Sequence, residues 1–443
     1  MFTASPKKRY LAVALAALAA VSMWSYVRKI LIPYQVQDAA QVGRPRGVLS
    51  DLYPRWFGAR ELLLHGRNPY SQEVTREIQR GYYGRSLDPP HPGDPKDQAG
   101  FAYPVYAVFL LAPFVHAQFS VVQAWGEWIL GLLALTSLLM WQRVVGSRFP
   151  IVGSLAAMLF LLASYPFVEA ASLQQPVLLV MALLAGSFLA RNRGRLFLSG
   201  VLMAVATIKP QTVVFPVILM LMWVSWNWRE RRRWFYGFAA TMLVLLAASE
   251  YLLTGWLFQF YGALRAYQTY MAGNSLLDMF MTPHWAWLGR TVIVIGILWV
   301  NWKSRGALES SVESRRALSL TLAGAVLSAP NLGTYNQILL VPAMLLIVEQ
   351  WNTILRGSRF VRGIASLMLT ILAWPWVASG ALALAVLVFH ASWPTQAELL
   401  LPLYGTLPLP LATAAVLLAL PAKRSGDRSL AAVPRGVSCT FVC

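Results

Sequence analysis

Long apolar stretches alternate with short polar connections along most of the chain, and this pattern predicts a bundle of membrane-crossing helices. Several stretches approach the ~20 consecutive apolar residues that a helix needs to cross the hydrocarbon core of a bilayer. We therefore expect an all-α polytopic membrane protein. The expected transmembrane helices are twelve in number and lie near residues 10–27, 121–142, 151–168, 176–190, 196–210, 212–228, 235–253, 285–302, 317–332, 337–350, 364–388 and 398–420.

The pattern is interrupted after the first helix by a long polar segment that is rich in acidic residues. Within it, the stretch from Tyr103 to Val115 is apolar but too short to cross, and it contains Pro104 and Pro113. We expect an interfacial or re-entrant helix there, on the outer face of the membrane. The resulting division is an N-terminal helix (1–27), an extracytoplasmic loop (28–120), a transmembrane core (121–420) and a cytoplasmic tail (421–443).

Composition and charge support this scheme. Hydrophobic residues make up 57% of the chain and charged residues 12%, which excludes an ordinary soluble globular protein. The net charge of +19 comes from short basic clusters at the ends of apolar segments, as the positive-inside rule predicts. We therefore expect the lipid bilayer as a partner and no nucleic acid. With Lys7 to Arg9 in the cytoplasm, every later basic cluster also falls on the cytoplasmic side.

The two ends of the chain add little chemistry. The apolar run from Leu11 to Val27 resembles a signal peptide but lacks a clean cleavage site, so we interpret it as an uncleaved helix. The only cysteines, Cys439 and Cys443, lie in the terminal tail and indicate neither a disulfide framework nor a metal site.

Polar residues that a membrane should discourage gather on the predicted outer face, and ionisable residues at membrane depth often mark reaction centres or pathways. Lys209 is the clearest case because it ends an otherwise apolar helix. The candidate site comprises Asp51, Arg55, Arg60 and Glu61 in the first loop, Gln175 after the third helix, Lys209 after the fifth, Asn274 and His284 in the loop expected between Gly255 and His284, and Tyr335.

Several short motifs carry a resemblance to a known family. They are Asp51-Leu52-Tyr53, Glu61-Leu62-Leu63 followed by Gly66 and Pro69-Tyr70, Tyr103-Pro104, Gln175, Ile208-Lys209-Pro210, Gly273-Asn274-Ser275 and Ser328-Ala329-Pro330. In this order and spacing the motifs, which extend from about residue 45 to 345, resemble glycosyltransferase family 87. That family contains GT-C membrane mannosyltransferases and their relatives.

The resemblance implies a GT-C-like fold and an extracytoplasmic sugar transfer, often of mannose, from a polyprenyl-phosphate donor to a lipid or glycan acceptor in the cell envelope. Asp51 then takes the role of the first-loop catalytic aspartate. A positioned carboxylate suits this chemistry, because it removes the proton of a weakly nucleophilic hydroxyl as it attacks. Polyprenyl phosphate needs only cationic or hydrogen-bonding groups such as Lys209, Arg55 or Arg60 to stabilise its growing charge. An inverting displacement is the simplest outcome, and no cofactor beyond the donor is implied; metal dependence stays open.

Each candidate also has a structural interpretation. Asp51 could cap a helix running from Tyr53 to Leu64, Glu61 could pair with a nearby arginine, and Lys209 could extend its charged end toward the interface. His284 and Gln175 could serve helix ends. The aspartates Asp88, Asp94 and Asp97 are interleaved with prolines, which indicates a flexible lid rather than a metal cluster.

The chain departs from the family near residue 330, where many members resemble Ser-Pro-x-Ser-Trp-x-His. Here the tryptophan and histidine are missing, and Tyr335 or Asn336 is left to fill the polar role. The identity of the sugar is therefore open. Two other classes of function fit twelve helices: a lipid or solute transporter or flippase, which the lack of a convincing internal repeat disfavours, and a noncatalytic subunit of an envelope-assembly complex.

Overall fold

The computed structural model describes residues 6–41, 50–147, 149–271, 276–329, 333–390 and 394–420. Within these ranges the regular elements are all helices. The all-α prediction is therefore confirmed for the part of the chain that the structure describes.

The first helix is longer than the hydrophobic pattern predicted. It consists of α1 (Pro6–Tyr26), a π-helical turn η1 (Val27–Leu31) and α2 (Ile32–Gln41), and Tyr10–Gln41 is one candidate membrane span of 32 residues. We expected the helix to end at residue 27, before Arg28 and Lys29. The helix continues because Arg28 turns outward, over the ring of Trp24 at 4.8 Å, while Ile30 is fully buried.

Two longer helices, of which the second is strongly amphipathic, lie in the polar segment that follows. They are α3 (Leu52–His65), which ends at Gly66 in the left-handed conformation, and α4 (Gln72–Tyr83), which begins at the side-chain cap of Ser71. The apolar face of α4 packs on α3, and its buried residues Val74, Ile78 and Tyr82 recur every fourth position as a helix requires. The apolar run predicted to be interfacial forms only η2 (Val105–Ala107), α5 (Val108–Leu111) and η3 (Ala112–Phe114).

The remaining helices form the core that carries the site. They are α6 (Phe119–Val145), α7 (Ile151–Ala163), α8 (Tyr165–Ser172), α9 (Val177–Asn192), α10 (Leu196–Ala206), α11 (Pro210–Trp226), α12 (Trp228–Leu252), α13 (Trp256–Met271), α14 (Pro283–Ser304), α15 (Val312–Ser328), η4 (Thr334–Leu340), α16 (Val341–Glu349), α17 (Trp351–Leu355), α18 (Arg359–Leu387), α19 (Gln396–Leu399), α20 (Leu401–Thr406) and α21 (Leu409–Ala419).

Six helices in the described ranges are long and apolar enough to cross a membrane, or seven if α7 and α8, which are bent by 60° at their junction, form one span. A polytopic membrane protein is therefore confirmed, but twelve full crossings are not. All twelve predicted segments overlap helical structure in the described ranges, yet five of them correspond to helices of at most 17 residues, namely α9, α10, α11, α15 and η4 with α16. The loop expected between Gly255 and His284 contains the helix α13, which has too few consecutive apolar residues to be predicted as a span.

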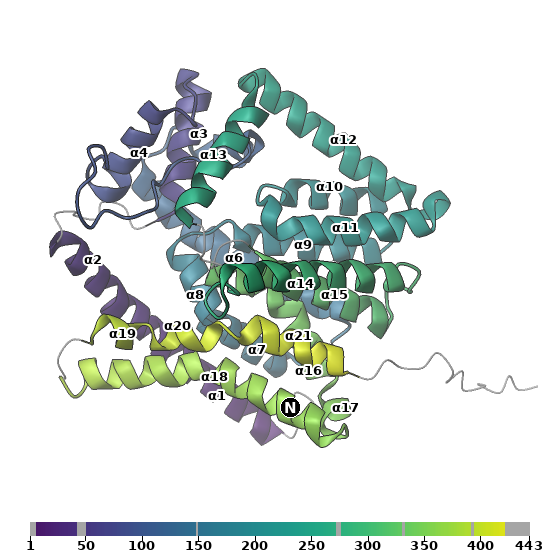
Figure 1. Ribbon diagram of the computed structural model, residues 1–443. Helices are drawn as coiled ribbons and strands as arrows, with labels where there is room; N and C mark the ends of the chain where they lie inside the picture. The colour runs from purple at the N-terminus through teal and green to yellow at the C-terminus, as the bar shows by residue number, and fades with distance from the viewer. Residues whose placement is uncertain are drawn as a thin grey trace, which may run out of the picture.

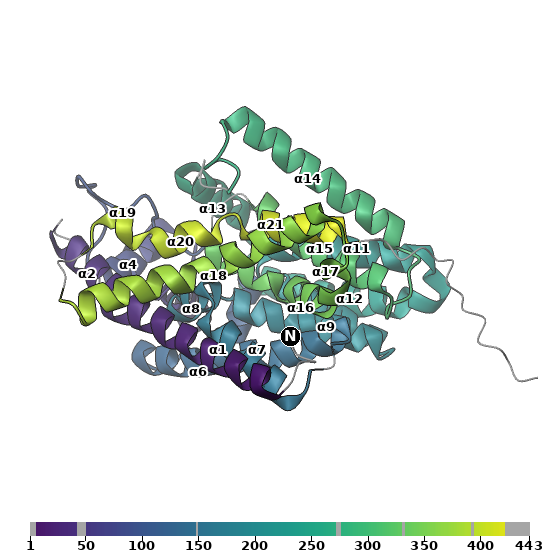
Figure 2. The same ribbon diagram turned by 90° about the horizontal axis from the view of Figure 1, so that it is seen from below.

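The long helices α12, α14 and α18 are largely exposed, whereas the shorter α9 and α15 are largely buried near the centre (Figure 1). The helix α1 packs against α7 and α18, and Figure 2 shows α1 and α18 approaching each other most closely near the end of α1 that leads into α2. Toward the centre, α9 packs between α6 and α10, and α10 lies against α12. The α10–α12 contact depends on two glycines, because a Cβ atom on Gly200 would lie 2.2 Å from the carbonyl oxygen of Trp234, and one on Gly237 would lie 2.2 Å from that of Phe197.

Candidate active site

The carboxylate of Asp51 is held from two sides. Asp51 directly precedes α3, but its side chain makes no capping hydrogen bond to that helix. Instead, the hydroxyl of Tyr82 donates to Oδ1 at 2.6 Å, and Nε2 of Gln175 donates to Oδ2. The capping interpretation of Asp51 does not describe this geometry, because both carboxylate oxygens face groups from distant parts of the sequence.

The turn between α8 and α9 fixes the backbone around Asp51. The N–H of Asp51 donates to the carbonyl of Leu173 at 3.1 Å, and the hydroxyl of Ser50 donates to Oε1 of Gln174 at 2.5 Å. Gln174 itself has a positive φ of 50°, which is uncommon for a residue other than glycine because this backbone conformation is strained. This turn therefore joins the start of α3 to the end of α8 through several hydrogen bonds.

Two buried cations belong to the same centre. Arg55 donates from Nη1 to the carbonyl of Gln174 at 3.1 Å and lies over the ring of Tyr103 at 4.9 Å. Lys209, which is 2% exposed in the turn between α10 and α11, lies within electrostatic range of Arg55 and Asp51. Within the described residues neither cation has an ion-pair partner within 4 Å, so their charges are not neutralised by direct contact with a carboxylate.

Lys209 is held by neutral groups from η4. Its Nζ donates to Oδ1 of Asn336 at 2.8 Å and lies 4.5 Å from the centre of the Tyr335 ring. The same helical turn is tied to α8, because the hydroxyl of Thr334 donates to the carboxylate of Glu169. The short helix α8 thus contacts both the segment that holds Lys209 and, through the turn at its end, the segment that holds Asp51.

A second carboxylate, that of Asp97, lies within electrostatic range of Asp51. Burial raises the pKa of Asp97, the hydrogen bond from the N–H of Ala99 to Oδ1 at 2.9 Å opposes this, and the negative charge of Asp51 raises it further. The hydroxyl of Tyr83 also donates to the carbonyl of Asp97 at 2.7 Å. The Pro-rich segment is therefore anchored to α4 next to the Asp51 carboxylate.

The other candidates predicted from the sequence lie in different surroundings. Arg60 lies over the ring of Trp56 at 5.5 Å, and Glu61 forms an ion pair with Arg67 at 2.7 Å. His284 is exposed in the first turn of α14. None of these three makes a hydrogen bond or ion pair with Asp51. Asn274 lies outside the described residues.

Sequence reasoning did not single out Tyr82 or Asp97 as members of the site. The spacing of Val74, Ile78 and Tyr82 could have placed Tyr82 on the face of α4 that packs on α3, but not against Asp51. Among the described residues, no three histidine, cysteine, aspartate or glutamate side chains gather where they could hold a metal ion.

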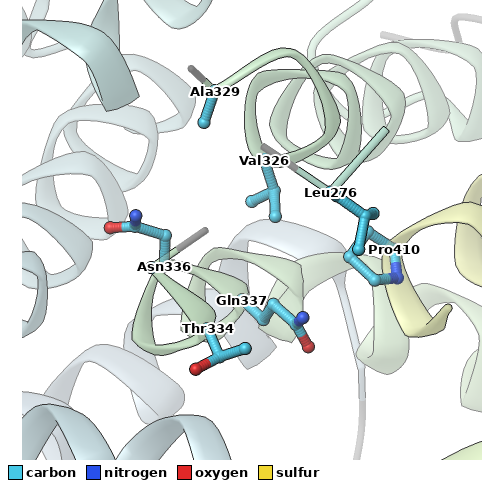
Figure 3. A pocket seen from close by; sticks show the side chains of 8 residues that line it. Leu276, Val326, Ala329, Thr334, Asn336, Gln337 and Pro410 are labelled. Atoms are coloured by element: carbon cyan, nitrogen blue, oxygen red, sulfur yellow. The ribbon is translucent and has the colours of Figure 1, made fainter. Parts of the chain in front are cut away.

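A narrow pocket lies beside η4 (Figure 3). Leu276, Val326 and Pro410 form one side, and Thr334 and Gln337 the other, while the amide of Asn336 points away from Pro410. Its volume of about 10 Å³ is near the lower limit for a single water molecule, so it does not accommodate a sugar.

The helices and the half-buried carboxylate with its two buried cations define a polytopic membrane protein with a polar centre. A sequence model of glycosyltransferase family 87 matches residues 101–330, more than half of the 443 residues. The chain belongs to glycosyltransferase family 87, a membrane-associated family of the GT-C type. Membership of this family implies the activity of a membrane glycosyltransferase. No curated protein and no solved structure matches the chain. The matched region includes Glu169, Gln175 and Lys209, whereas Asp51 and Tyr335 lie outside it.

Proposed function

We propose that the protein transfers a hexosyl group from a polyprenyl-phosphate donor to a hydroxyl group of a lipid or glycan acceptor. The reaction takes place on the extracytoplasmic face of the plasma (inner) membrane, with Asp51 as the general base. The observation that carries this proposal is the Asp51 carboxylate, which two donors orient while two buried cations lie nearby.

Asp51 has the properties of a positioned base. An ionised carboxylate accepts about four hydrogen bonds, so those from Tyr82 and Gln175 leave room for one from an acceptor hydroxyl. As the hydroxyl oxygen attacks the anomeric carbon, its proton passes to Asp51 and the bond from that carbon to the phosphate oxygen breaks. The polyprenyl phosphate leaves with the bonding electrons, and the configuration at the anomeric carbon inverts.

Lys209 and Arg55 are suited to the leaving phosphate. Negative charge grows on the phosphate as the sugar departs, and fixed cations in a site with little water stabilise that growing charge strongly. Neither cation is paired with a carboxylate in the described part of the chain, so both can interact with an anionic ligand. Lys209 is held by Tyr335 and Asn336, the two residues left to fill the polar role of the tryptophan and histidine that are missing from the family pattern.

The sugar, the acceptor and any metal requirement are matters for the assay. Mannose is the first donor sugar to test because the family resemblance implies it, and glucose is the second because the departure at Tyr335 and Asn336 changes the surroundings of Lys209. Parallel reactions with and without a metal chelator test for a divalent ion.

The experiment uses the full chain in proteoliposomes with radiolabelled polyprenyl-phosphate mannose or glucose and a lipid extract from the host envelope as acceptor. We expect transfer by the wild type, and a loss of about 10²–10⁴-fold in Asp51→Asn, the usual contribution of a general base. Asp88→Asn is the matched control, because Asp88 is exposed and paired with Arg76 away from Asp51.

Equal transfer by Asp51→Asn and the wild type would remove Asp51 from the mechanism. If neither protein transfers sugar, the same proteoliposomes serve to test whether the protein is a transporter. Movement of labelled lipid or solute across the bilayer would then identify a transporter or flippase, and the absence of both activities would favour a noncatalytic envelope-assembly subunit.

A further inference from the structure

A cavity of about 110 Å³ lies between the first helix and α8, beside the candidate active site. On the side of the first helix, the lining consists of Val27 and Leu31 from the π-helical turn and Ile32 and Gln35 from α2, which is apolar apart from Gln35. Tyr165, Glu169 and Ser172 from α8 form a polar wall. Such π-helical turns are rare and frequently occur at functional sites. The cavity thus combines a hydrocarbon-like wall with a row of oxygen atoms.

Two of its hydroxyl groups are available to a ligand. Among the described residues, the hydroxyls of Tyr165 and Ser172 have no hydrogen-bond partner, although Tyr165 is only 8% exposed. Neither hydroxyl is among the fully buried, unpartnered side-chain atoms of the described residues, so both are accessible from the cavity that they line. Polar groups of a ligand in the cavity would satisfy both hydroxyls.

Charge and size restrict the class of ligand. Glu169 lines the cavity as a hydrogen-bond acceptor, so an ionised phosphate or carboxylate, which can only accept, is poorly matched to this side chain. The oxygen-lined wall favours hydroxyl groups, which can donate as well as accept. A cavity of ~150 Å³ binds benzene, so this one accommodates a few carbon and oxygen atoms of a larger molecule, such as a glycerol unit or one edge of a sugar.

The cavity is directly connected to the base. Leu173, which also lines it, accepts the backbone hydrogen bond from Asp51. A hydroxylated group held by α8 therefore lies next to the segment that carries the Asp51 carboxylate. We propose that this cavity is the acceptor subsite and that it takes the neutral, hydroxylated head of a membrane lipid, with the start of the hydrocarbon part along Val27, Leu31 and Ile32.

This inference deepens the proposed sugar transfer and rests on it, so its test measures binding without turnover. The full chain in phosphatidylcholine nanodiscs is titrated with radiolabelled octyl glucoside below its micelle concentration, with empty nanodiscs subtracted. Octyl glucoside combines a neutral polyol head with a single alkyl chain. Octyl phosphate, which has the same tail and an anionic head, serves as the competitor.

We expect saturable binding to the wild type and to Asp51→Asn. Leu31→Trp fills the cavity and should weaken binding at least tenfold, whereas Leu18→Trp, on the same helix at a position that is 63% exposed, should bind as the wild type does. Tyr165→Phe keeps the ring and removes one hydrogen bond, so it should weaken binding roughly fivefold to tenfold. Octyl phosphate should compete at least tenfold less well than unlabelled octyl glucoside.

Equal binding by Leu31→Trp, Tyr165→Phe and the wild type would overturn the acceptor subsite, as would stronger competition by octyl phosphate. Tyr165→Phe guards against a folding defect, because it is nearly isosteric. If these variants lose binding but the wild type transfers no sugar, the cavity still binds a hydroxylated lipid head and the proposed reaction is wrong. If sugar transfer depends on Asp51 but Leu31→Trp changes neither transfer nor binding, the proposed reaction holds and the cavity assignment is wrong.

Discussion

The ammonium group of Lys209 donates to Oδ1 of Asn336 at 2.8 Å, so a buried cation is held by an amide rather than by a carboxylate. Burying a charge without an opposite charge in contact is costly. A protein retains such an arrangement most readily where an anionic ligand supplies the missing charge. This relationship is the structural basis for assigning Lys209 to the phosphate of the donor.

Replacing Lys209 by methionine should lower kcat for sugar transfer by about 10²–10³-fold, the usual effect of removing one group that stabilises developing negative charge. Methionine keeps the length and apolar character of the side chain, so the fold should survive. The measurement is the initial rate at saturating donor in proteoliposomes. Lys96→Met, at an exposed position in the Pro-rich segment, is the control. An unchanged kcat in Lys209→Met would contradict the assignment.

Replacing Tyr82 by phenylalanine should lower kcat roughly tenfold, because it removes one hydrogen bond to a charged group and leaves the ring in place. The affinity for the donor should not change, since the hydroxyl of Tyr82 donates to the proposed base, whereas the phosphate is assigned to Lys209 and Arg55. The neighbouring Tyr83→Phe removes a hydrogen bond to the carbonyl of Asp97 instead and should have little effect on kcat. If the two variants have the same rate, Tyr82 has no special role in positioning Asp51.

The helical class and most helix positions could be predicted from the sequence, because apolar runs between basic clusters are visible without any knowledge of packing. The length of the first helix could not. Arg28 and Lys29 resemble a helix end, and only the packing of Ile30 shows that the helix continues. The number of crossings was also out of reach, since several short apolar helices resemble membrane spans in composition but not in length.

The candidate site was predicted in part for a related reason. Asp51, Gln175 and Lys209 stand out as polar residues beside apolar segments, and the structure brings them into one centre. Tyr82 and Asp97 do not stand out, because a tyrosine on an amphipathic helix and an aspartate in a Pro-rich segment are ordinary in sequence. Their relation to Asp51 arises from tertiary contacts between segments about 30 to 45 residues apart, which no local pattern encodes.

The close contact between α10 and α12 predicts a specific sensitivity to added volume. Gly200→Ala and Gly237→Ala each place a methyl group against backbone atoms of the partner helix, which cannot move aside as a side chain can. Each should destabilise the protein by about 1–3 kcal/mol, as overpacking usually does. Gly131→Ala on α6, where nothing lies within 4 Å of the added atom, is the control. Thermal unfolding of the purified variants in detergent would decide, and equal stability of all three would refute the contact.

Asp97 predicts a dependence of stability on pH. Burial raises the pKa of its carboxyl, so the folded chain binds this proton more tightly than the unfolded chain does. The linked stability is fully present below the ordinary aspartate pKa and is lost as the pH rises through the raised value. Asp97→Asn keeps an acceptor for the N–H of Ala99 and removes the charge. At neutral pH its unfolding midpoint should therefore equal or exceed that of the wild type, by roughly 1–3 °C.

The comparison is made by measuring the unfolding midpoint of both proteins between acidic and neutral pH. Any advantage of Asp97→Asn should shrink as the pH falls and the wild-type carboxyl becomes protonated. The opposite result would be an unfolding midpoint of Asp97→Asn that falls below that of the wild type at neutral pH but not in acid. It would show that the charge of Asp97 stabilises the fold.

The uninterrupted run Tyr10–Gln41 is 32 residues long, which at 1.5 Å per residue corresponds to about 48 Å. The hydrocarbon layer of a bilayer is only ~30 Å thick. If Tyr10 lies at one edge of this layer and the helix stands upright, η1 lies about 26–32 Å further along, at the opposite edge. The helix α2 then stands among the lipid headgroups. The depth of the cavity beside η1 then depends on bilayer thickness, so a thinner membrane would lift it into water and a thicker one would draw it into the lipid.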